Sequence, residues 1–190
     1  MKTERNDILS VINNTLAEYE NDIGQNDIQF ARRVYEEGLQ KYIDRLTAIG
    51  FSNKTCVLDA GCGFGQWSVA MSLTNEYVCS CDVSSLRVDV LSRIASDLGI
   101  TNIRIKKSSI ERLDHSNGTV DSIFCYSVIY LSDIEKALAE FKRVIRRDGL
   151  LYISSNGLGW HLHNFDNSPN ATDDYDPRTA AVDAIANTIN

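Results

Sequence analysis

Residues 57–65 read Val-Leu-Asp-Ala-Gly-Cys-Gly-Phe-Gly, and this stretch decides how the rest of the chain is interpreted. A short apolar strand leads directly into a turn that has glycine at every second position, Gly61, Gly63 and Gly65. Glycine adopts positive φ at no steric cost and has no Cβ atom, so the backbone of such a turn can approach a ligand closely. The stretch therefore predicts a strand, a turn and a helix that together hold a nucleoside-containing cofactor.

From residue 55 onward, strand-like and helix-like segments alternate. The predicted strands are 55–60, 77–82, 102–107, 120–126 and 149–155, and the predicted helices between them are 65–73, 85–98 and 133–147. Gly149 is expected to end the last of these helices. This order predicts an α/β fold with a doubly wound, mostly parallel sheet that is covered on both faces. Ligands of such sheets bind beyond the carboxyl ends of the strands.

The flanking segments predict two further parts. Residues 1–50 are expected to form a helical cap, with one helix from about Asp7 to Tyr19 and a second along the apolar stripe from Ile28 to Ile49. Residues 51–155 are expected to form the α/β core. Within 156–190, the stretch 156–176 is loop-like, and a helix begins near Pro177 and is cut off at the chain end. Because that helix has no cap, we expect the chain to be a fragment of a longer protein.

Composition and charge restrict the classes of partner. The chain has 190 residues, of which 43% are hydrophobic and 24% charged, and its formal net charge is −7. An acidic protein is poorly suited to bind a phosphate backbone, which requires clustered Lys and Arg. The densest basic group is expected to lie on one solvated helix face: Lys142, Arg143, Arg146 and Arg147. No apolar run approaches the roughly 20 residues of a membrane span. We therefore predict neither a nucleic-acid partner nor a membrane span.

The five cysteines predict reduced thiols. They fall in or beside the predicted strands, at Cys56, Cys62, Cys79, Cys81 and Cys125. Their odd number and apolar surroundings are typical of small buried side chains. Cys79 and Cys81 share one face of a strand, but no second pair completes a zinc-ligand set. The sequence thus predicts no metal site and a reducing, cytoplasmic location.

Two ligand classes, dinucleotides and S-adenosylmethionine, are bound by a strand, a glycine turn and a helix of this kind. The dinucleotide fingerprint requires glycine at positions one, three and six, and the sixth position counted from Gly61 is Gln66. The pattern present, Asp59-x-Gly-x-Gly-x-Gly, closely resembles the first motif of class I S-adenosylmethionine-dependent methyltransferases. Asp82 at the end of the second strand, residues 120–131 and residues 137–153 resemble later motifs of that family, in the same order. The resemblance covers about residues 54–155 and is nearest to small-molecule, ubiquinone-biosynthesis-like members.

The resemblance implies a Rossmann-like fold, S-adenosyl-L-methionine as cofactor, and roles for particular residues. The cofactor-binding positions carried over are Asp59, Gly61, Cys62, Gly63, Gly65, Asp82, Val83, Ser109, Ile110 and Tyr126. In these roles the glycines pass under the methionine portion, Asp82 holds the ribose and Val83 flanks the adenine. Ser109 stands where the family usually has an acidic residue, so the adenine contacts are expected to differ. The Ile110 amide remains in reach of an adenine nitrogen.

Methyl transfer from a sulfonium places few demands on catalytic side chains. The reaction is an in-line displacement with an activated leaving group, so the protein mainly supplies alignment, and a base is needed only when the acceptor must lose a proton. Candidate groups are His161, His163 and Tyr126, although loop histidines are more often merely solvated. A His161-x-His163 pair with Asp166 is weakly specific for a metal.

The predicted function is methyl transfer to a small-molecule acceptor. One alternative is an NAD-dependent oxidoreductase, which Gln66 and the lack of a Tyr-x-x-x-Lys pair disfavour. Another is a non-catalytic subunit that only binds the cofactor. The resembling family adds two strands after the fifth, whereas nothing after Trp160 reads as a strand. The unfinished sheet edge indicates either a fragment or a homodimer through that edge.

Overall fold

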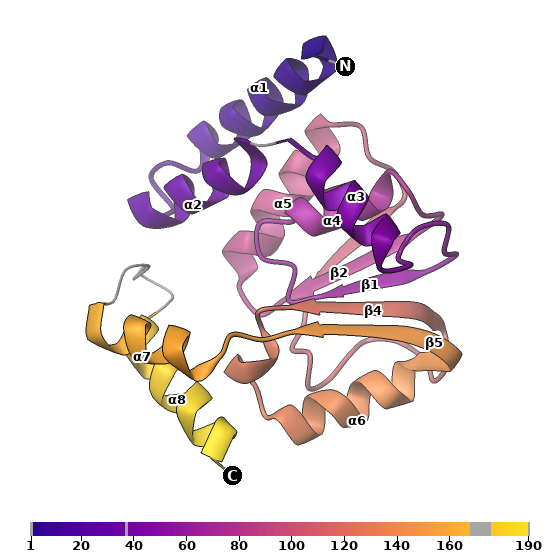
Figure 1. Cartoon of the computed structure of the whole chain (residues 1–190). Helices are drawn as coiled ribbons and strands as arrows, with labels where there is room; N and C mark the ends of the chain where they lie inside the picture. Colours follow the sequence, from indigo (N-terminus) through magenta and orange to yellow (C-terminus); the bar gives the residue numbers. More distant parts are fainter. Residues whose placement is uncertain (1, 37, 168–175, 190) are drawn as a thin grey trace.

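A computed structural model of the chain describes residues 2–36, 38–167 and 176–189 (Figure 1). The helices are α1 (Lys2–Glu18), α2 (Gln25–Glu36), α3 (Gln40–Ala48), α4 (Gln66–Ser72), α5 (Ser85–Asp97), the 3₁₀ turn η1 (Ile129–Leu131), α6 (Ile134–Val144), α7 (Leu158–Asn167) and α8 (Pro177–Ile189). The strands are β1 (Val57–Ala60), β2 (Val78–Asp82), β3 (Ile103–Lys107), β4 (Val120–Tyr126) and β5 (Ile145–Ser154). Among the described helices, none is long and apolar enough to cross a membrane.

The five strands form one parallel sheet in the order β3-β2-β1-β4-β5. The chain builds outward from β1 to β3 on one side, then returns to add β4 and β5 on the other. This arrangement confirms the predicted doubly wound α/β fold. Strand order reverses between β1 and β4, and ligands of such sheets bind at the carboxyl ends of the strands beside that point.

The central strands β1, β2 and β4 are buried on both faces, and their successive side chains point alternately to one face and the other. Val57 and Phe124 belong to a large apolar cluster that includes residues of α1 to α5, whereas Leu58 and Ile123 belong to a second cluster with α6. Figure 1 shows α3 and α4 on one side of the sheet and α6 on the other. The central strands are therefore buried along most of their length, and they carry a few buried polar side chains such as Asp59 among the apolar ones.

The apolar stripe from Ile28 to Ile49 does not form one helix. α2 ends at Glu36 and α3 begins at Gln40, and between them Gly38 adopts φ +80°. A glycine in the left-handed conformation ends a helix. The expected first helix is confirmed, but it starts at Lys2 rather than near Asp7.

The prediction of a loop at 156–176 is wrong where α7 lies, and residues 168–175 fall outside the described part. The buried residues of α7 are polar, His161 and Asn164, whereas Leu158 and Leu162 are about half exposed. Because the apolar side chains lie on the exposed side, the helix lacks the periodicity that predicts a buried face. α8 confirms the expected helix start at Pro177, and it packs against α7.

The predicted helix 133–147 ends early. α6 stops at Val144 and the next residue starts β5, so Arg146 and Arg147 lie on a strand and Gly149 is not a helix cap. Parallel pairing with β4 determines this boundary: Val120 aligns with Ile145, and the ladder resumes after an irregularity. Arg146 forms an ion pair with the buried Asp121. In the described part of the chain no strand pairs with the outer edge of β5.

Candidate cofactor site

The glycine turn lies at the carboxyl end of β1, beside β4 in the sheet. The amides of Gly61 and Cys62 both donate to the carbonyl of Cys81, at 2.9 Å each, and the Gly65 amide donates to the Cys62 carbonyl at 2.9 Å. These main-chain bonds fasten the turn to the last residues of β2. The turn is thus a fixed element of the sheet rather than a mobile loop.

The three glycines of the turn serve different purposes. All have positive φ, +83°, +54° and +85° for Gly61, Gly63 and Gly65. A Cβ on Gly61 would lie 2.5 Å from a methyl of Val128, and one on Gly65 would lie 2.0 Å from a methyl of Leu91. A Cβ on Gly63 would meet nothing within 4 Å. Close packing within the protein therefore requires glycine at 61 and 65, and Gly63 is the one of the three that faces open space.

This difference predicts the effects of two alanine substitutions. Gly65→Ala is expected to destabilise the protein by about 2–4 kcal/mol, since overpacking adds to the strain of positive φ. Gly63→Ala should cost only about 1–2 kcal/mol, from the strain alone. Urea unfolding of the two variants measures both values. Equal losses of stability would contradict the assignment of Gly65 to packing against Leu91.

Asp82 closes the other side of the turn. It is the last residue of β2 and is 7% exposed, and its carboxylate accepts from the amides of Gly63 at 2.9 Å and Ser84 at 3.0 Å. An ionised carboxylate has about four lone-pair positions. Two of them remain for the hydroxyls of a ribose, so the predicted ribose role is compatible with this geometry.

Asp59 lies beneath the turn. It is 1% exposed and accepts from the Ser68 hydroxyl at 2.6 Å, and Ser68 in turn accepts from Ser80 at 2.8 Å. Burial raises the pKa of Asp59 to about 7; the hydrogen bond from Ser68 acts against this rise, and the charge of Asp82 adds to it. The carboxyl group therefore contacts α4 and ties this helix to β1.

The remaining predicted cofactor-binding residues differ in exposure. Cys62 and Ile110 are buried, at 3% and 5% exposed, and burial raises the pKa of the Cys62 thiol well above its usual value. The Ser109 hydroxyl accepts from the amide of Glu111 at 3.1 Å. Val83, which follows Asp82, is 65% exposed. Of these side chains, Val83 is thus the one that offers an open apolar surface.

Tyr126 is packed into an aromatic cluster at the end of β4. Its ring is stacked with Phe124 at 5.9 Å and tilted against Trp67 at 5.2 Å. The Arg45 guanidinium lies 6.0 Å from the ring centroid. The half-buried ring is held in one orientation and forms an aromatic wall at the carboxyl end of the sheet.

The two histidines of α7 are not brought together. His161 is 2% exposed, with Nε2 at 3.1 Å from the Asn156 carbonyl, so this nitrogen carries the proton. His163 is exposed and its Nδ1 lies 3.3 Å from the Asn167 amide. Residues two apart on a helix point in different directions. In the described part of the chain no group of three or more His, Cys, Asp or Glu side chains is placed to hold a metal.

Gln66 is a polar residue of the turn that sequence reasoning left out of the site. Its side-chain oxygen is buried and has no hydrogen-bond partner within the described residues. Leaving such an acceptor unpaired costs about 1–3 kcal/mol. In the sequence, Gln66 is notable only as the residue that breaks the dinucleotide fingerprint. Its position directly after Gly65 is the one feature of the sequence that could have placed it at the site.

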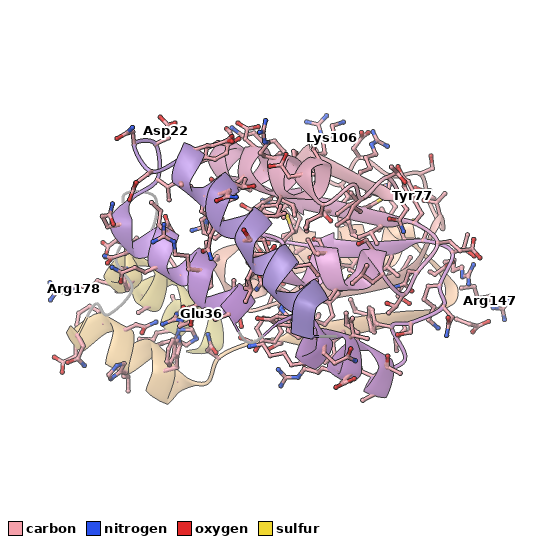
Figure 2. The ribbon with its side chains drawn as sticks, turned by 90° about the horizontal axis from the view of Figure 1, so that it is seen from above. Asp22, Glu36, Tyr77, Lys106, Arg147 and Arg178 are labelled. Carbon is pink, nitrogen blue, oxygen red and sulfur yellow. The ribbon has the colours of Figure 1, made fainter. Side chains whose placement is uncertain are left out.

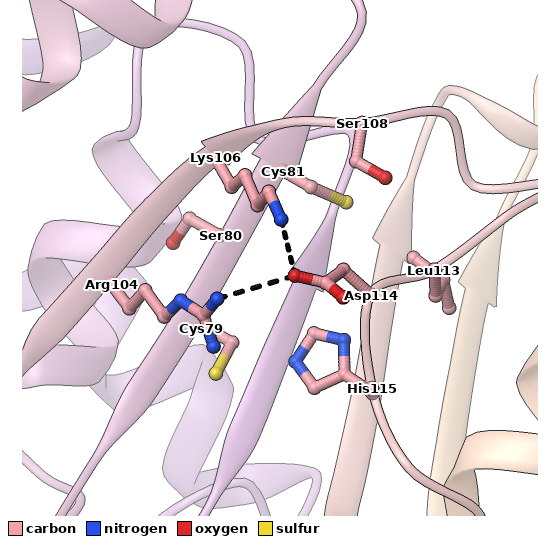
Figure 3. A pocket seen from close by; sticks show the side chains of 9 residues that line it. All are labelled: Cys79, Ser80, Cys81, Arg104, Lys106, Ser108, Leu113, Asp114 and His115. Carbon is pink, nitrogen blue, oxygen red and sulfur yellow. Dashed lines mark hydrogen bonds and ion pairs between the residues drawn. The ribbon is translucent and has the colours of Figure 1, made fainter.

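Two hollows lie away from the turn. The smaller, about 10 Å³, is bordered by β2, β3 and the loop after β3, where Asp114 bridges Arg104 and Lys106 (Figure 3). It has room for about one water molecule. The larger, about 390 Å³, lies between α1 and α2. The larger hollow is the one with room for a small molecule.

Known proteins resemble the chain over this region. Residues 57–149 match the family model described as "Methyltransferase domain". YcgJ of Bacillus subtilis (strain 168), named an uncharacterized methyltransferase, is 33% identical over 94 residues, 49% of this chain and 37% of that protein. The YcgJ crystal structure has a TM-score of 0.61 at 22% identity, covering 70% of this chain and 62% of that one.

Two further relatives extend the similarity. A structure described as a SAM-dependent methyltransferase from Aquifex aeolicus is 28% identical, with a TM-score of 0.52, covering 55% of this chain and 58% of that one. The tRNA 5-carboxymethoxyuridine methyltransferase of Escherichia coli (strain K12) is 28% identical over 148 residues, 72% of this chain and 57% of that protein. The chain thus spans less than two thirds of the length of these relatives.

Proposed function

Because this chain contains a class I S-adenosylmethionine-dependent methyltransferase domain, we propose that it transfers the methyl group of S-adenosylmethionine to a small-molecule acceptor. The observation that supports this most directly is the open backbone at Gly63, held against the Asp82 carboxylate. In this proposal Asp82 holds the ribose, Val83 flanks the adenine and the glycine turn supports the methionine portion.

The proposed reaction is an in-line displacement that relies on alignment. Placing acceptor and sulfonium in line can contribute about 7–11 kcal/mol. His161 is buried with one ring nitrogen on a main-chain carbonyl, and Tyr126 is packed among aromatic rings. The proposal therefore assigns neither residue a proton-transfer step, and it suits an acceptor that needs no strong base.

The acceptor class has one competing candidate. The E. coli relative is named for a tRNA nucleoside, and its match covers 72% of this chain. The formal net charge of −7 favours a small molecule, since tRNA binding rests on neutralising phosphates. The small-molecule acceptor is therefore the proposal, and tRNA is the alternative to be measured beside it.

Two measurements test the proposed function. Calorimetry with S-adenosylhomocysteine and with NAD should show binding of the first and none of the second. Radiolabelled methyl transfer from S-adenosylmethionine is then assayed with a small-molecule metabolite pool and with total tRNA. We expect the radiolabel to appear in the small-molecule pool. If the radiolabel appears in tRNA alone, the acceptor is tRNA and the small-molecule proposal is wrong. Cofactor binding without any transfer would identify a non-catalytic subunit.

We also propose a homodimer through the outer edge of β5. Leu150, Leu151 and Ile153 on this strand are 37–40% exposed. An apolar edge strand offers unpaired main-chain groups to a second copy. Sedimentation equilibrium of the wild type and of Leu151→Lys should show a dimer that the substitution weakens; a wild-type monomer at high concentration contradicts this assembly.

A further inference from the structure

The hollow between α1 and α2 has the size and the fixed walls of a binding pocket. Its volume of about 390 Å³ lies within the range of roughly 300–1,000 Å³ for small-molecule sites. α1 is attached to α5 through Thr15, whose hydroxyl donates to Asp97 at 2.9 Å, and through the Arg93–Glu18 ion pair at 3.2 Å. These contacts tie α1 to α5, and α1 also packs against α2.

The lining of this hollow combines an apolar wall with a cation. The lining residues are Leu9, Ile12, Asn13, Arg32, Tyr35 and Glu36. Leu9 and Ile12 supply aliphatic surface from α1, and half-buried Arg32 supplies a guanidinium from α2. Where side chains are described, no carboxylate lies within 4.0 Å of the Arg32 guanidinium. A guanidinium in such a pocket matches a carboxylate, which it binds through two parallel hydrogen bonds.

One side chain links this hollow to the glycine turn. Tyr35 lines the hollow, is 1% exposed, and donates its hydroxyl to the Phe64 carbonyl at 2.8 Å. Phe64 stands between Gly63 and Gly65. Tyr35 therefore borders the hollow and also contacts the turn that faces the proposed cofactor, so only this side chain separates a molecule in the hollow from the turn.

We propose that this hollow seats the non-reacting end of the methyl acceptor, and that this end is an aliphatic carboxylate bound to Arg32. The inference rests on the proposed function. Binding energy from a remote part of a substrate holds the reacting atom in place, which an alignment-based reaction requires. Glu36 also lines the hollow and is exposed, and Figure 2 labels it; its charge opposes an anionic ligand.

The test uses three probes that have similar aliphatic tails and different polar groups: hexanoate, hexanol and hexylamine. Their binding is measured by calorimetry on the full chain saturated with S-adenosylhomocysteine, so that the cofactor site is filled. Hexanoate should bind about tenfold or more tightly than hexanol, because it alone forms charged hydrogen bonds with Arg32. Tighter binding of hexylamine, or no preference among the three, overturns the proposal.

Substitutions locate the site. Arg32→Gln should remove the preference for hexanoate, whereas Arg33→Gln, on an exposed neighbour that lies over Phe30, should leave it unchanged. Glu36→Gln should bind hexanoate as tightly as the wild type or more tightly. Leu9→Trp fills the hollow and should abolish binding while circular dichroism shows an intact fold. Unchanged hexanoate binding in Arg32→Gln or Leu9→Trp overturns the proposal.

The remaining outcome concerns the cofactor itself. If Arg32→Gln lowers the affinity for S-adenosylhomocysteine tenfold or more, Arg32 holds the carboxylate of the cofactor and the acceptor proposal is overturned. If the wild type binds no S-adenosylhomocysteine, the proposed function fails instead. Hexanoate binding measured in the absence of S-adenosylhomocysteine then tests the hollow on its own.

Discussion

Replacing Asp82 with Ala is expected to weaken the binding of S-adenosylhomocysteine by about 1.5–3 kcal/mol, roughly 10- to 150-fold. The carboxylate is 7% exposed and already accepts from the amides of Gly63 and Ser84. Its removal takes away both the proposed ribose acceptor and the group that holds the turn open at Gly63. Calorimetry at constant salt measures the loss.

Two matched variants separate these contributions. Asp82→Asn keeps an oxygen that can accept from one amide but lacks the charge, so its loss should fall between those of the wild type and Asp82→Ala. Asp89→Ala removes a carboxylate from an exposed position of α5 and should leave the affinity unchanged. An Asp82→Ala variant that folds and binds S-adenosylhomocysteine as the wild type does would remove Asp82 from the site.

Replacing Asp59 with Asn is expected to flatten the pH dependence of stability between about pH 4 and pH 7. In the folded protein burial raises the pKa of Asp59 from 3.8 to about 7. Between these values the unfolded chain has released the proton while the folded protein keeps it, so the wild type loses stability as pH rises. A shift of about three units corresponds to a contribution on the order of 4 kcal/mol.

The measurement is the free energy of unfolding of the wild type and of Asp59→Asn in urea at pH 4.5, 6 and 8. The amide side chain of the variant retains an oxygen for the Ser68 hydroxyl, so the fold should persist. Burial lowers the pKa of His115, which makes stability rise with pH near 6 and partly opposes the effect of Asp59. The difference between the two proteins cancels that contribution. Parallel curves for wild type and variant would refute the raised pKa.

Several features of the fold were predictable from local sequence. The alternation of apolar strands with helices after residue 55 predicted a parallel doubly wound sheet, and the structure confirms it. Strand 120–126 was predicted with the bounds that the structure has. The cofactor class was predicted from the resemblance of the Asp-x-Gly-x-Gly-x-Gly stretch and the later segments to methyltransferase motifs, and it is supported by the family match over 57–149. The strands and helices follow from runs of neighbouring residues, because the conformational preference of a segment depends mainly on residues within a few positions of one another.

Two failures share one cause. The helix at α7 was missed because its buried residues, His161 and Asn164, are polar and its apolar ones are exposed. The boundary between α6 and β5 was misplaced because the pairing of Ile145 with Val120 determines it. In both cases a segment distant in sequence decides which conformation and which face are buried.

The sequence by itself determined the alternation of strands and helices between residues 55 and 155 and the central glycine turn, because backbone freedom and hydrophobic periodicity are local properties. The class of cofactor came from the resemblance of this turn to a known motif. The tertiary structure decided what each residue of the turn does. Leu91 approaches Gly65 from α5, Val128 approaches Gly61 from beyond β4, and Tyr35 reaches Phe64 from α2. Which glycine faces open space depends on these neighbours, and only folding brings them together.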